Sequence, residues 1–335
     1  MLVHHNFLVT PKLVFVFTVV LHAHLALSFP LSHLFHHANV SSEPTTDVTP
    51  DFISSTLLRP ALFTRAIYCG EENVTKWECE PCEALGKDVR VIKWGGDDNA
   101  IPNYIVAHDN STNTIVVSHR GTNTKSFLSI LTDLEIKHAH LDKSIFNQSN
   151  DDITVHAGFQ DTFKQTSSII LEVVKKALTE HQSHSLLIAG HSQGAAIATL
   201  DAVMLHQQLD SSIKKSVVVF GLPRMGNEHW ANYVDSTVSL YHCVFRPALS
   251  AESGLYFGIQ IGSGFHRVTD RKDPIPDVPP HLLNFFHPSG EIHIQEVDNA
   301  GQATKVVKCP GQENEHCSEG NSIFHDEFLN HRVQF

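Results

Sequence analysis

The sequence predicts an α/β fold in which a mostly parallel sheet carries helices on both faces. Short apolar runs alternate with longer segments of helical periodicity along most of the chain, as expected of strands joined by crossover helices. One run, 216–220 (SVVVF), is β-branched without polar alternation, which is typical of a strand buried on both faces. Another stretch, 185–200 (SLLIAGHSQGAAIATL), passes from an apolar run through two glycines into a small-residue helix.

The other elements follow from periodicity. Apolar residues at helical spacing between positions 57 and 67 predict a helix that ends at Cys69-Gly70. A longer helix is predicted over 160–178, and the helix after the two glycines is predicted to reach about Leu209. Further strands are predicted at 90–94, 104–107, 114–118, 186–189, 265–269 and 292–297.

The segment GHSQG at 190–194 has the composition of a sharp strand-to-helix turn. In the pattern G-x-S-x-G, the glycines let strand and helix approach, while the serine (here Ser192) is held on a strained turn with its hydroxyl exposed. Free N–H groups at the start of the helix favour developing negative charge beside that hydroxyl. An ordinary glycine-rich turn is the alternative, but the apolar strand before it and the alanine-rich helix after it favour a nucleophile.

The composition limits the class of partner. The 335 residues are 41% hydrophobic and 18% charged, which is enough for one large core or two modest ones. The net charge of −12 argues against a nucleic-acid partner and against docking on anionic membrane surfaces. The net charge of the whole chain therefore favours neutral substrates over polyanionic ones.

The N-terminal region is predicted to direct export. Residues 1–28 read as a signal peptide, because Lys12 precedes an apolar run and Ala26-Leu27-Ser28 supplies small residues for cleavage. A membrane anchor is the alternative, but histidines and a proline interrupt the run, and we expect no stable membrane insertion. Residues 29–50 are polar and aperiodic, as in a flexible leader or pro-segment, so that one catalytic domain is expected over 51–335. We therefore expect an extracellular protein.

Several motifs, in this order, resemble those of the fungal class 3 lipases, a family of lipases and feruloyl esterases with an α/β-hydrolase fold. The resemblance covers about 51–335, and GHSQG departs from the more common GHSLG of that family. The motifs are SHRGT at 118–122, TDL at 132–134, VHAGF at 155–159, GHSQG at 190–194, GLPRMGN at 221–227 and RVTDRKDPIPDVPP at 267–280.

The resemblance implies a catalytic triad in the order Ser, Asp, His. Ser192 matches the nucleophile and Asp273 matches the acid, with Asp270 as the fallback acid. His331 fits the register of the family's histidine better than His325 does. The resemblance also implies an oxyanion hole built from the backbone N–H groups of Thr122 and Gln193, to which the Thr122 hydroxyl adds a bond or locks the loop.

The segment NTKSFLSILTD at 123–133 is the candidate lid. Its apolar face is flanked by polar residues, and a surface helix packed on the core is the alternative. In the family this segment covers the site in water, although the usual lid tryptophan is absent here. The residues of the apolar face are Phe127, Leu128, Ile130 and Leu131.

The cysteines are interpreted as disulfides of an exported protein rather than as a metal site. The resemblance implies the pairs Cys79–Cys82 and Cys309–Cys317, while Cys69 lacks the partner that the family places beyond the catalytic histidine. The odd Cys243 lies in 239–260, an extra stretch without periodicity. This stretch is either an error of the gene model or a true insertion near the acid loop that shapes the substrate mouth.

The resulting hypothesis is a secreted serine carboxylic-ester hydrolase, foremost a triacylglycerol lipase, that works through an acyl-enzyme on Ser192. A feruloyl-type esterase of the same fold is the first alternative, and a catalytically silent lipid-binding protein is the second. We expect a monomer that meets its lipid or ester substrate at an oil–water interface, with no cofactor, no metal and no nucleic acid.

Overall fold

The structure is a computed structural model that describes residues 40–122, 136–147, 150–238, 264–321 and 330–333. All of these lie in one compact unit, 37–335. The predicted signal peptide, the lid candidates Phe127, Leu128, Ile130 and Leu131, the stretch 239–260 and His325 lie outside the described residues.

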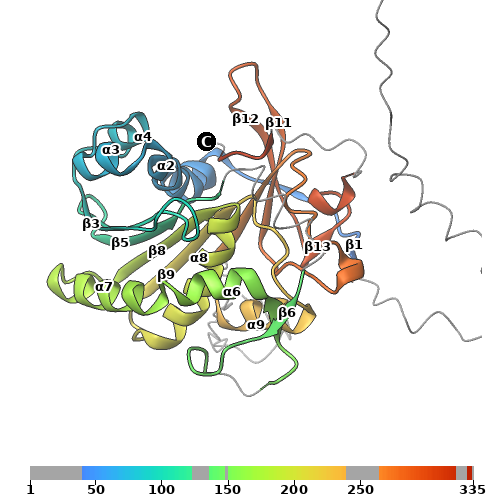
Figure 1. Cartoon of the computed structure of the whole chain (residues 1–335). Coiled ribbons are helices and arrows are strands. Elements are labelled where there is room, and N and C mark those ends of the chain that lie inside the picture. Colours follow the sequence, from blue (N-terminus) through green and yellow to red (C-terminus); the bar gives the residue numbers. More distant parts are fainter. Residues whose placement is uncertain (1–39, 123–135, 148–149, 239–263, 322–329, 334–335) are drawn as a thin grey trace, which may run out of the picture. The chain divides into compact units, whose positions relative to one another are not determined.

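The described residues form a nine-stranded central sheet, which is coloured from blue through green to red in Figure 1. Its interior consists of parallel neighbours, and antiparallel strands complete both edges. In spatial order the strands are β2 (Thr46–Asp47), β12 (Ala303–Lys308), β11 (Glu291–Val297), β10 (Phe265–Asp270), β9 (Lys214–Phe220), β8 (Ser185–His191), β5 (Thr114–His119), β4 (Tyr104–Asp109) and β3 (Val89–Gly95).

The expectation of a mostly parallel sheet needs correction, because the sheet is mixed. Only the pairings β11–β10, β10–β9, β9–β8 and β8–β5 are parallel. The links from β3 to β4, from β4 to β5 and from β11 to β12 are too short for a crossover helix, so the strands that they join run antiparallel. The parallel centre is the part that carries the candidate site.

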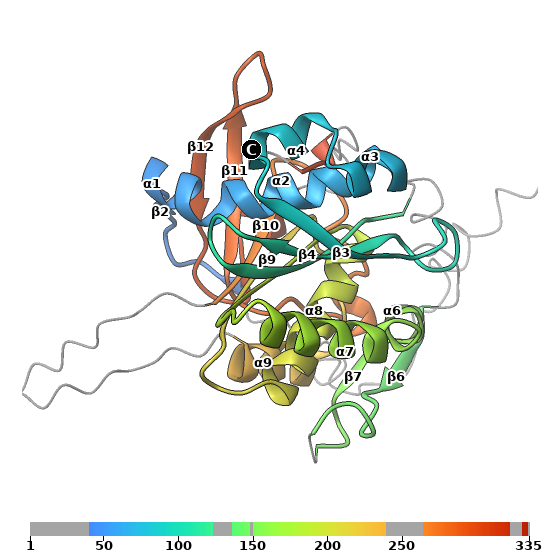
Figure 2. The ribbon, with the colours of Figure 1, turned by 90° about the vertical axis from the view of Figure 1, so that its left-hand side faces the viewer.

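Helices cover both faces of the sheet, as predicted (Figure 2). Alternate residues of a strand point to opposite faces, so Ile115 and Val117 join the core beneath α6 to α9, whereas Val116 joins the core beneath α2 to α4. The helices of one face are α2 (Leu58–Ala66), α3 (Glu71–Lys76) and α4 (Glu80–Leu85). Those of the other face are α6 (Ala157–Lys164), α7 (Ser167–Glu180), α8 (Gln193–Gln208) and α9 (Glu228–Thr237).

Two boundaries differ from the sequence prediction. The helix predicted over 160–178 is two helices, α6 and α7, because the chain turns at Gln165 and Thr166. Residues 40–50 are not a free leader: β1 (Val40–Ser41) pairs with β13 (Glu313–Asn314), and β2 pairs with β12. The polar sequence hides these strands because each is two residues long and lies at a sheet edge, where no apolar alternation is needed.

The remaining elements are short. A two-stranded sheet joins β6 (His138–His140) to β7 (Thr154–His156). The N-terminal helix α1 (Pro50–Phe52) begins after Thr49, whose hydroxyl caps the N–H of Phe52, and it continues through a π-helical turn into α2. In the part of the chain that the structure describes, no helix has the length and apolar character needed to cross a bilayer.

Both disulfides implied by the resemblance are present in the structure, with S–S distances of 1.96 Å for Cys79–Cys82 and 2.04 Å for Cys309–Cys317. Cys69 forms no disulfide with any described residue. Because Cys243 lies outside the described residues, peptide mapping of the non-reduced protein has to decide whether it pairs with Cys69.

Buried histidines make the fold sensitive to acid. His156 stacks on Phe159 and lies against the tilted ring of Phe285, and neither of its ring nitrogens has a hydrogen-bond partner among the described residues. Burial, assisted by the nearby His138, lowers the pKa of His156 from 6.5 to about 4. The unfolded chain therefore binds more protons than the folded one between these pH values, so stability is complete above pH 6.5 and is lost as the pH falls towards 4.

We expect His156→Phe to flatten the pH dependence of the free energy of unfolding. Each such histidine contributes a slope of about 1.4 kcal/mol per pH unit between its two pKa values. Urea unfolding at a series of pH values below neutrality measures this slope for the variant and the parent. His229→Gln on α9, where the side chain is exposed, serves as the control and should leave the slope unchanged. An unchanged slope in His156→Phe would contradict the prediction.

Candidate active site

The nucleophile candidate lies on a strained turn between β8 and α8. Ser192 has φ 59° and ψ −128°, a conformation that L-residues rarely adopt. The two flanking glycines permit this turn: a Cβ on Gly190 would lie 2.4 Å from the carbonyl oxygen of Gly194, and one on Gly194 would lie 2.4 Å from that of Arg120. The Ser192 N–H donates to the carbonyl of Phe220 on β9, which fixes the turn against the sheet.

The acid and base candidates meet beyond the carboxyl end of β10. His331 Nδ1 lies 2.8 Å from Asp273 Oδ2, and both side chains are buried. Asp273 Oδ1 also accepts the N–H of Ile275 at 3.0 Å, so the carboxylate is held at both oxygens. Because the carboxylate requires a proton on Nδ1, the Nε2 atom of His331 is left with a lone pair, as a general base needs.

Gly221 makes room for this pair. It has φ +56°, and an added Cβ would lie 2.8 Å from His331 Cε1 and 3.3 Å from Asp273 Oδ2. The glycine begins the motif GLPRMGN directly after β9. The chain that leaves the carboxyl end of β9 therefore lies closer to His331 than any residue with a side chain would allow.

The serine and the histidine have not yet formed a hydrogen bond with each other. Ser192 Oγ and His331 Nε2 are both buried, and neither has a hydrogen-bond partner in the part of the chain that the structure describes. The His331 ring stacks on His191, the residue before the serine, with ring centroids 4.5 Å apart. Catalytic hydrogen bonds often tighten only when substrate is bound, so the lack of a bond between Ser192 and His331 in this state is compatible with proton transfer.

The fallback acid takes no part in this arrangement. The Asp270 carboxylate pairs with the guanidinium of Arg271 at 2.9 Å, whereas His331 bonds to Asp273. His325, the other histidine considered, lies outside the described residues.

Arg224 anchors the loop that follows Asp273. The backbone N–H of Arg224 donates to Val278 O at 3.0 Å, and its guanidinium donates to Asp277 O at 2.5 Å. The same guanidinium binds Glu313 at 3.1 Å and also pairs with Glu319. The loop that follows Asp273 is thus held by Arg224, a residue of the motif GLPRMGN that lies about fifty positions earlier in the sequence.

The oxyanion-hole candidates lie on two neighbouring turns. Thr122 follows β5 and Gln193 is the first residue of α8. The Thr122 hydroxyl donates to Gln193 Oε1, so its proton is not free for a substrate oxygen in this state. The hydroxyl therefore locks the loop, and the backbone N–H groups are left as the candidate donors. The sequence prediction treated Gln193 only as a backbone donor and missed this side-chain contact.

We expect Gln193→Leu and Thr122→Val each to lower kcat about tenfold with little change in KM, because each removes the same hydrogen bond. The double variant should then be no worse than either single variant, since only one interaction is lost. Steady-state kinetics on a soluble short-chain ester measure this. Losses that multiply in the double variant would show that the two side chains act independently.

Tyr68 and His191 line the approach to the serine. The N–H of Gly121 donates to the Tyr68 hydroxyl at 3.0 Å, and that oxygen lies 2.6 Å from His191 Nδ1. The hydroxyl end of Tyr68 is enclosed, and this burial raises the pKa of Tyr68 to about 12, so the phenol keeps its proton. All three groups are satisfied when the phenol donates to Nδ1, which places the proton of the neutral His191 ring on Nε2.

Burial also holds the pKa of His191 well below 6.5, and the nearby His331 adds to the effect. His191 is therefore a neutral donor rather than a second base. Sequence reasoning did not assign either residue, although Tyr68 stands next to Cys69 and His191 lies inside GHSQG.

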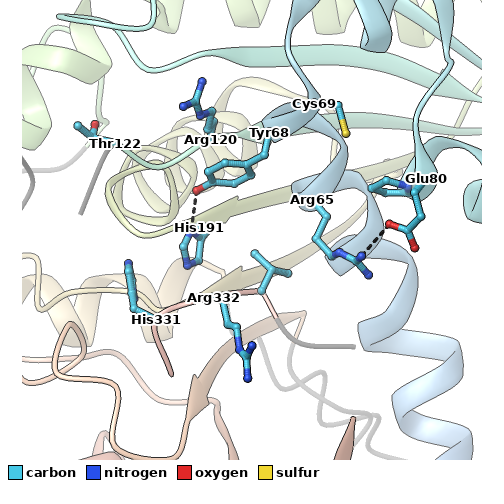
Figure 3. A pocket seen from close by; sticks show the side chains of 11 residues that line it. Arg65, Tyr68, Cys69, Glu80, Arg120, Thr122, His191, His331 and Arg332 are labelled. Atoms are coloured by element: carbon cyan, nitrogen blue, oxygen red, sulfur yellow. Dashed lines mark hydrogen bonds and ion pairs between the residues drawn. The ribbon is translucent and has the colours of Figure 1, made fainter. Parts of the chain in front are cut away.

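A cavity of about 680 Å³ opens beside these groups (Figure 3). It reaches from the candidate oxyanion loop and base across to α2 and the start of α4. The residues that line it are Arg65, Tyr68, Cys69, Glu80, Pro81, Arg120, Thr122, His191, His331, Arg332 and Val333.

Two groups of potential metal ligands occur among the described residues, and neither is assigned a metal. In the first, Glu291 lies beside the sulfurs of Cys309 and Cys317, which are bonded to each other. In the second, His281 lies beside Glu313 and Glu319, and both carboxylates already bind the guanidinium of Arg224.

Comparison with known proteins identifies the family. The family described as lipase (class 3) matches residues 116–283, about half of the chain. This match includes both glycines of the serine turn, the candidate acid and the motif GLPRMGN. The chain belongs to the class 3 lipase family.

Individual fungal lipases resemble the chain over most of its length. A secreted mono- and diacylglycerol lipase of Malassezia globosa is 27% identical over 281 residues, which are 84% of this chain and 80% of that protein. A lipase of Rhizopus niveus is 28% identical over 257 residues, which are 75% of this chain but only 55% of that protein.

Solved structures of fungal lipases share the fold. The crystal structure of a lipase from Rhizopus microsporus var. chinensis has a TM-score of 0.67 at 26% identity, with 87% of this chain and 89% of that chain covered. The LIP2 lipase of Yarrowia lipolytica has a TM-score of 0.71 at 23% identity, with 88% and 97% covered. The fold is therefore the α/β-hydrolase fold, and the class 3 lipase described here is a serine hydrolase.

Proposed function

We propose that this chain is a secreted lipase that hydrolyses the ester bonds of acylglycerols through an acyl-enzyme on Ser192. The observation that carries the proposal is the His331–Asp273 pair, which stands next to a serine on a strained turn at the start of α8. The Malassezia relative is named as a secreted mono- and diacylglycerol lipase, which supports both export and the substrate class.

The steps follow from the positions of these groups. His331 Nε2 takes the Ser192 proton as the serine oxygen attacks the ester carbonyl, and Asp273 stabilises the imidazolium that forms. The N–H groups of Thr122 and Gln193 stabilise the negative charge on the carbonyl oxygen. His331 then returns the proton to the leaving alcohol, and water releases the acyl group by the same route. We propose that the enzyme acts as a monomer.

The choice of substrate is testable with three esters. We expect hydrolysis of tributyrin and of emulsified triolein, little hydrolysis of methyl ferulate, and no hydrolysis by Ser192→Ala. If 123–133 acts as a lid, the rate should rise sharply where tributyrin passes its solubility limit, because an interface then binds the apolar face. Preferred hydrolysis of methyl ferulate would favour the feruloyl-type esterase. Binding of lipid without any turnover would favour the silent lipid-binding protein.

A further inference from the structure

The cavity beside His331 is cationic, although the chain as a whole has a net charge of −12. Three arginines line it, namely Arg65, Arg120 and Arg332, and among the described residues Glu80 is the only acidic one in the lining. A neutral acylglycerol has no group that requires such charge. A low-dielectric pocket lined by one sign of charge instead raises the local concentration of ligands of the opposite sign.

Two of the arginines have fixed positions. Arg65 pairs with Glu80 at 2.8 Å, and Arg120 pairs with Asp98 at 2.6 Å while it lies 5.1 Å over the Tyr68 ring. Their charges are therefore partly neutralised, and they mainly shape the cavity.

Arg332 differs from them. Within the described part of the chain, no carboxylate lies within ion-pair distance of its guanidinium. Arg332 is exposed and directly follows His331, and in Figure 3 its guanidinium points away from Tyr68. It lies by the turn between β11 and β12, where a Cβ added at Gly301 would be 3.6 Å from its Nη2. The lining of the cavity thus includes a cation, next to His331 in the sequence, that pairs with no acidic side chain of the described residues.

The inner end of the cavity offers a donor. The Tyr68 contact places the His191 proton on Nε2, and this buried atom has no hydrogen-bond partner among the described residues. In Figure 3 it points away from Tyr68, towards the side where His331 lies. A buried donor without an acceptor costs free energy, which a ligand oxygen in the cavity would recover.

We propose that this cavity binds an anionic oxygen group, a phosphate or a carboxylate, on the alcohol part of the ester substrate. Arg332 binds the anion and His191 Nε2 donates to an oxygen nearer the scissile ester. The alcohol part is chosen because His331 has to protonate the leaving oxygen, so the space around His331 and Arg332 receives the leaving group. This inference rests on the proposed esterase function and adds anionic monoacyl esters to its substrates.

The test compares soluble esters with one acyl group. The neutral ester is 1-butanoylglycerol, and the anionic esters are 1-butanoylglycerol 3-phosphate and 3-O-butanoylglyceric acid, which separate phosphate from carboxylate. We expect the parent enzyme to have a higher kcat/KM for at least one anionic ester than for the neutral one. Raising the salt concentration from about 0.05 to about 0.5 M should reduce this preference, because salt screens the exposed guanidinium.

Variants then locate the preference. Arg332→Gln should lower the ratio of anionic to neutral kcat/KM about tenfold, as expected for the loss of one charged hydrogen bond, and Arg332→Lys should restore part of it. The matched control is Lys175→Gln, which removes one positive charge from α7 on the other face of the sheet and should leave the ratio unchanged.

The outcomes separate the two proposals. If the parent hydrolyses 1-butanoylglycerol but prefers it to both anionic esters, the anion site is refuted and the proposed function stands. Equal losses for charged and neutral esters in Arg332→Gln would also refute the site, because they indicate a structural role only. If the parent hydrolyses none of the three esters, the proposed function itself fails.

Discussion

Replacement of His331 by alanine should lower kcat on a soluble short-chain ester by about four to six orders of magnitude, while KM changes little. Among the described residues, the imidazole is the only side chain that both bonds to Asp273 and stacks beside the serine turn, so its loss removes the proposed base and acid of the reaction. Ser192→Ala should cost a similar factor. Because the two residues act as a unit, the double variant should be no slower than either single variant.

His325→Ala is the matched control, since it removes a histidine six residues earlier in the same C-terminal segment. We expect it to keep activity within a few-fold of the parent enzyme. Circular dichroism of all variants checks that the fold is intact. An active His331→Ala together with an inactive His325→Ala would show that the catalytic histidine was assigned in the wrong register.

Gly221→Ala should lower kcat about a hundredfold without unfolding the protein. The added methyl group would lie 2.8 Å from His331 Cε1 and 3.0 Å from Nδ1, which is closer than side-chain atoms approach, so the ring or the Asp273 carboxylate has to move. A displacement of about 1 Å at a reacting group is enough to cost about a hundredfold in rate. The backbone strain at φ +56° adds a stability loss of about 1–2 kcal/mol.

Gly86→Ala separates strain from crowding. Gly86 has φ +93°, so alanine is strained there as well, but an added Cβ meets no atom within 4 Å. We expect Gly86→Ala to lose stability in urea unfolding and to keep kcat. If both variants lose stability and both keep kcat, then His331 and Asp273 can shift without loss of rate. The close approach of Gly221 would then have no role in catalysis.

Much of the fold was predictable because its signals are local. The β-branched run at 216–220 and the apolar run before GHSQG require burial on both faces, and they form β9 and β8 at the centre of the sheet. The antiparallel edges were missed because the pairing direction depends on the length of the connections, which periodicity does not report. The short strand β2 was missed because backbone hydrogen bonds to β12 alone define it.

The candidate site likewise has a part that the sequence predicted and a part that it did not. Ser192, Asp273 and His331 were chosen from motifs, and the structure places His331 beside Asp273, although 58 positions separate them. The tie between Thr122 and Gln193, the proton position on His191 and the cationic cavity were not predictable. Each depends on side-chain positions that bring distant segments within hydrogen-bond distance, and no spacing in the sequence encodes such distances.

The attachment of Arg224 has a consequence for how the enzyme must be produced. The carboxylates that hold its guanidinium, Glu313 and Glu319, flank Cys317, and the Cys309–Cys317 bridge closes the loop that contains Glu313. Arg224 in turn holds the carbonyls of the loop that follows Asp273. Oxidative folding thus completes the support of the loop that carries Asp273, the candidate acid. A recombinant host with a reducing cytoplasm is expected to yield protein that has the central sheet but low specific activity until the bridge is formed.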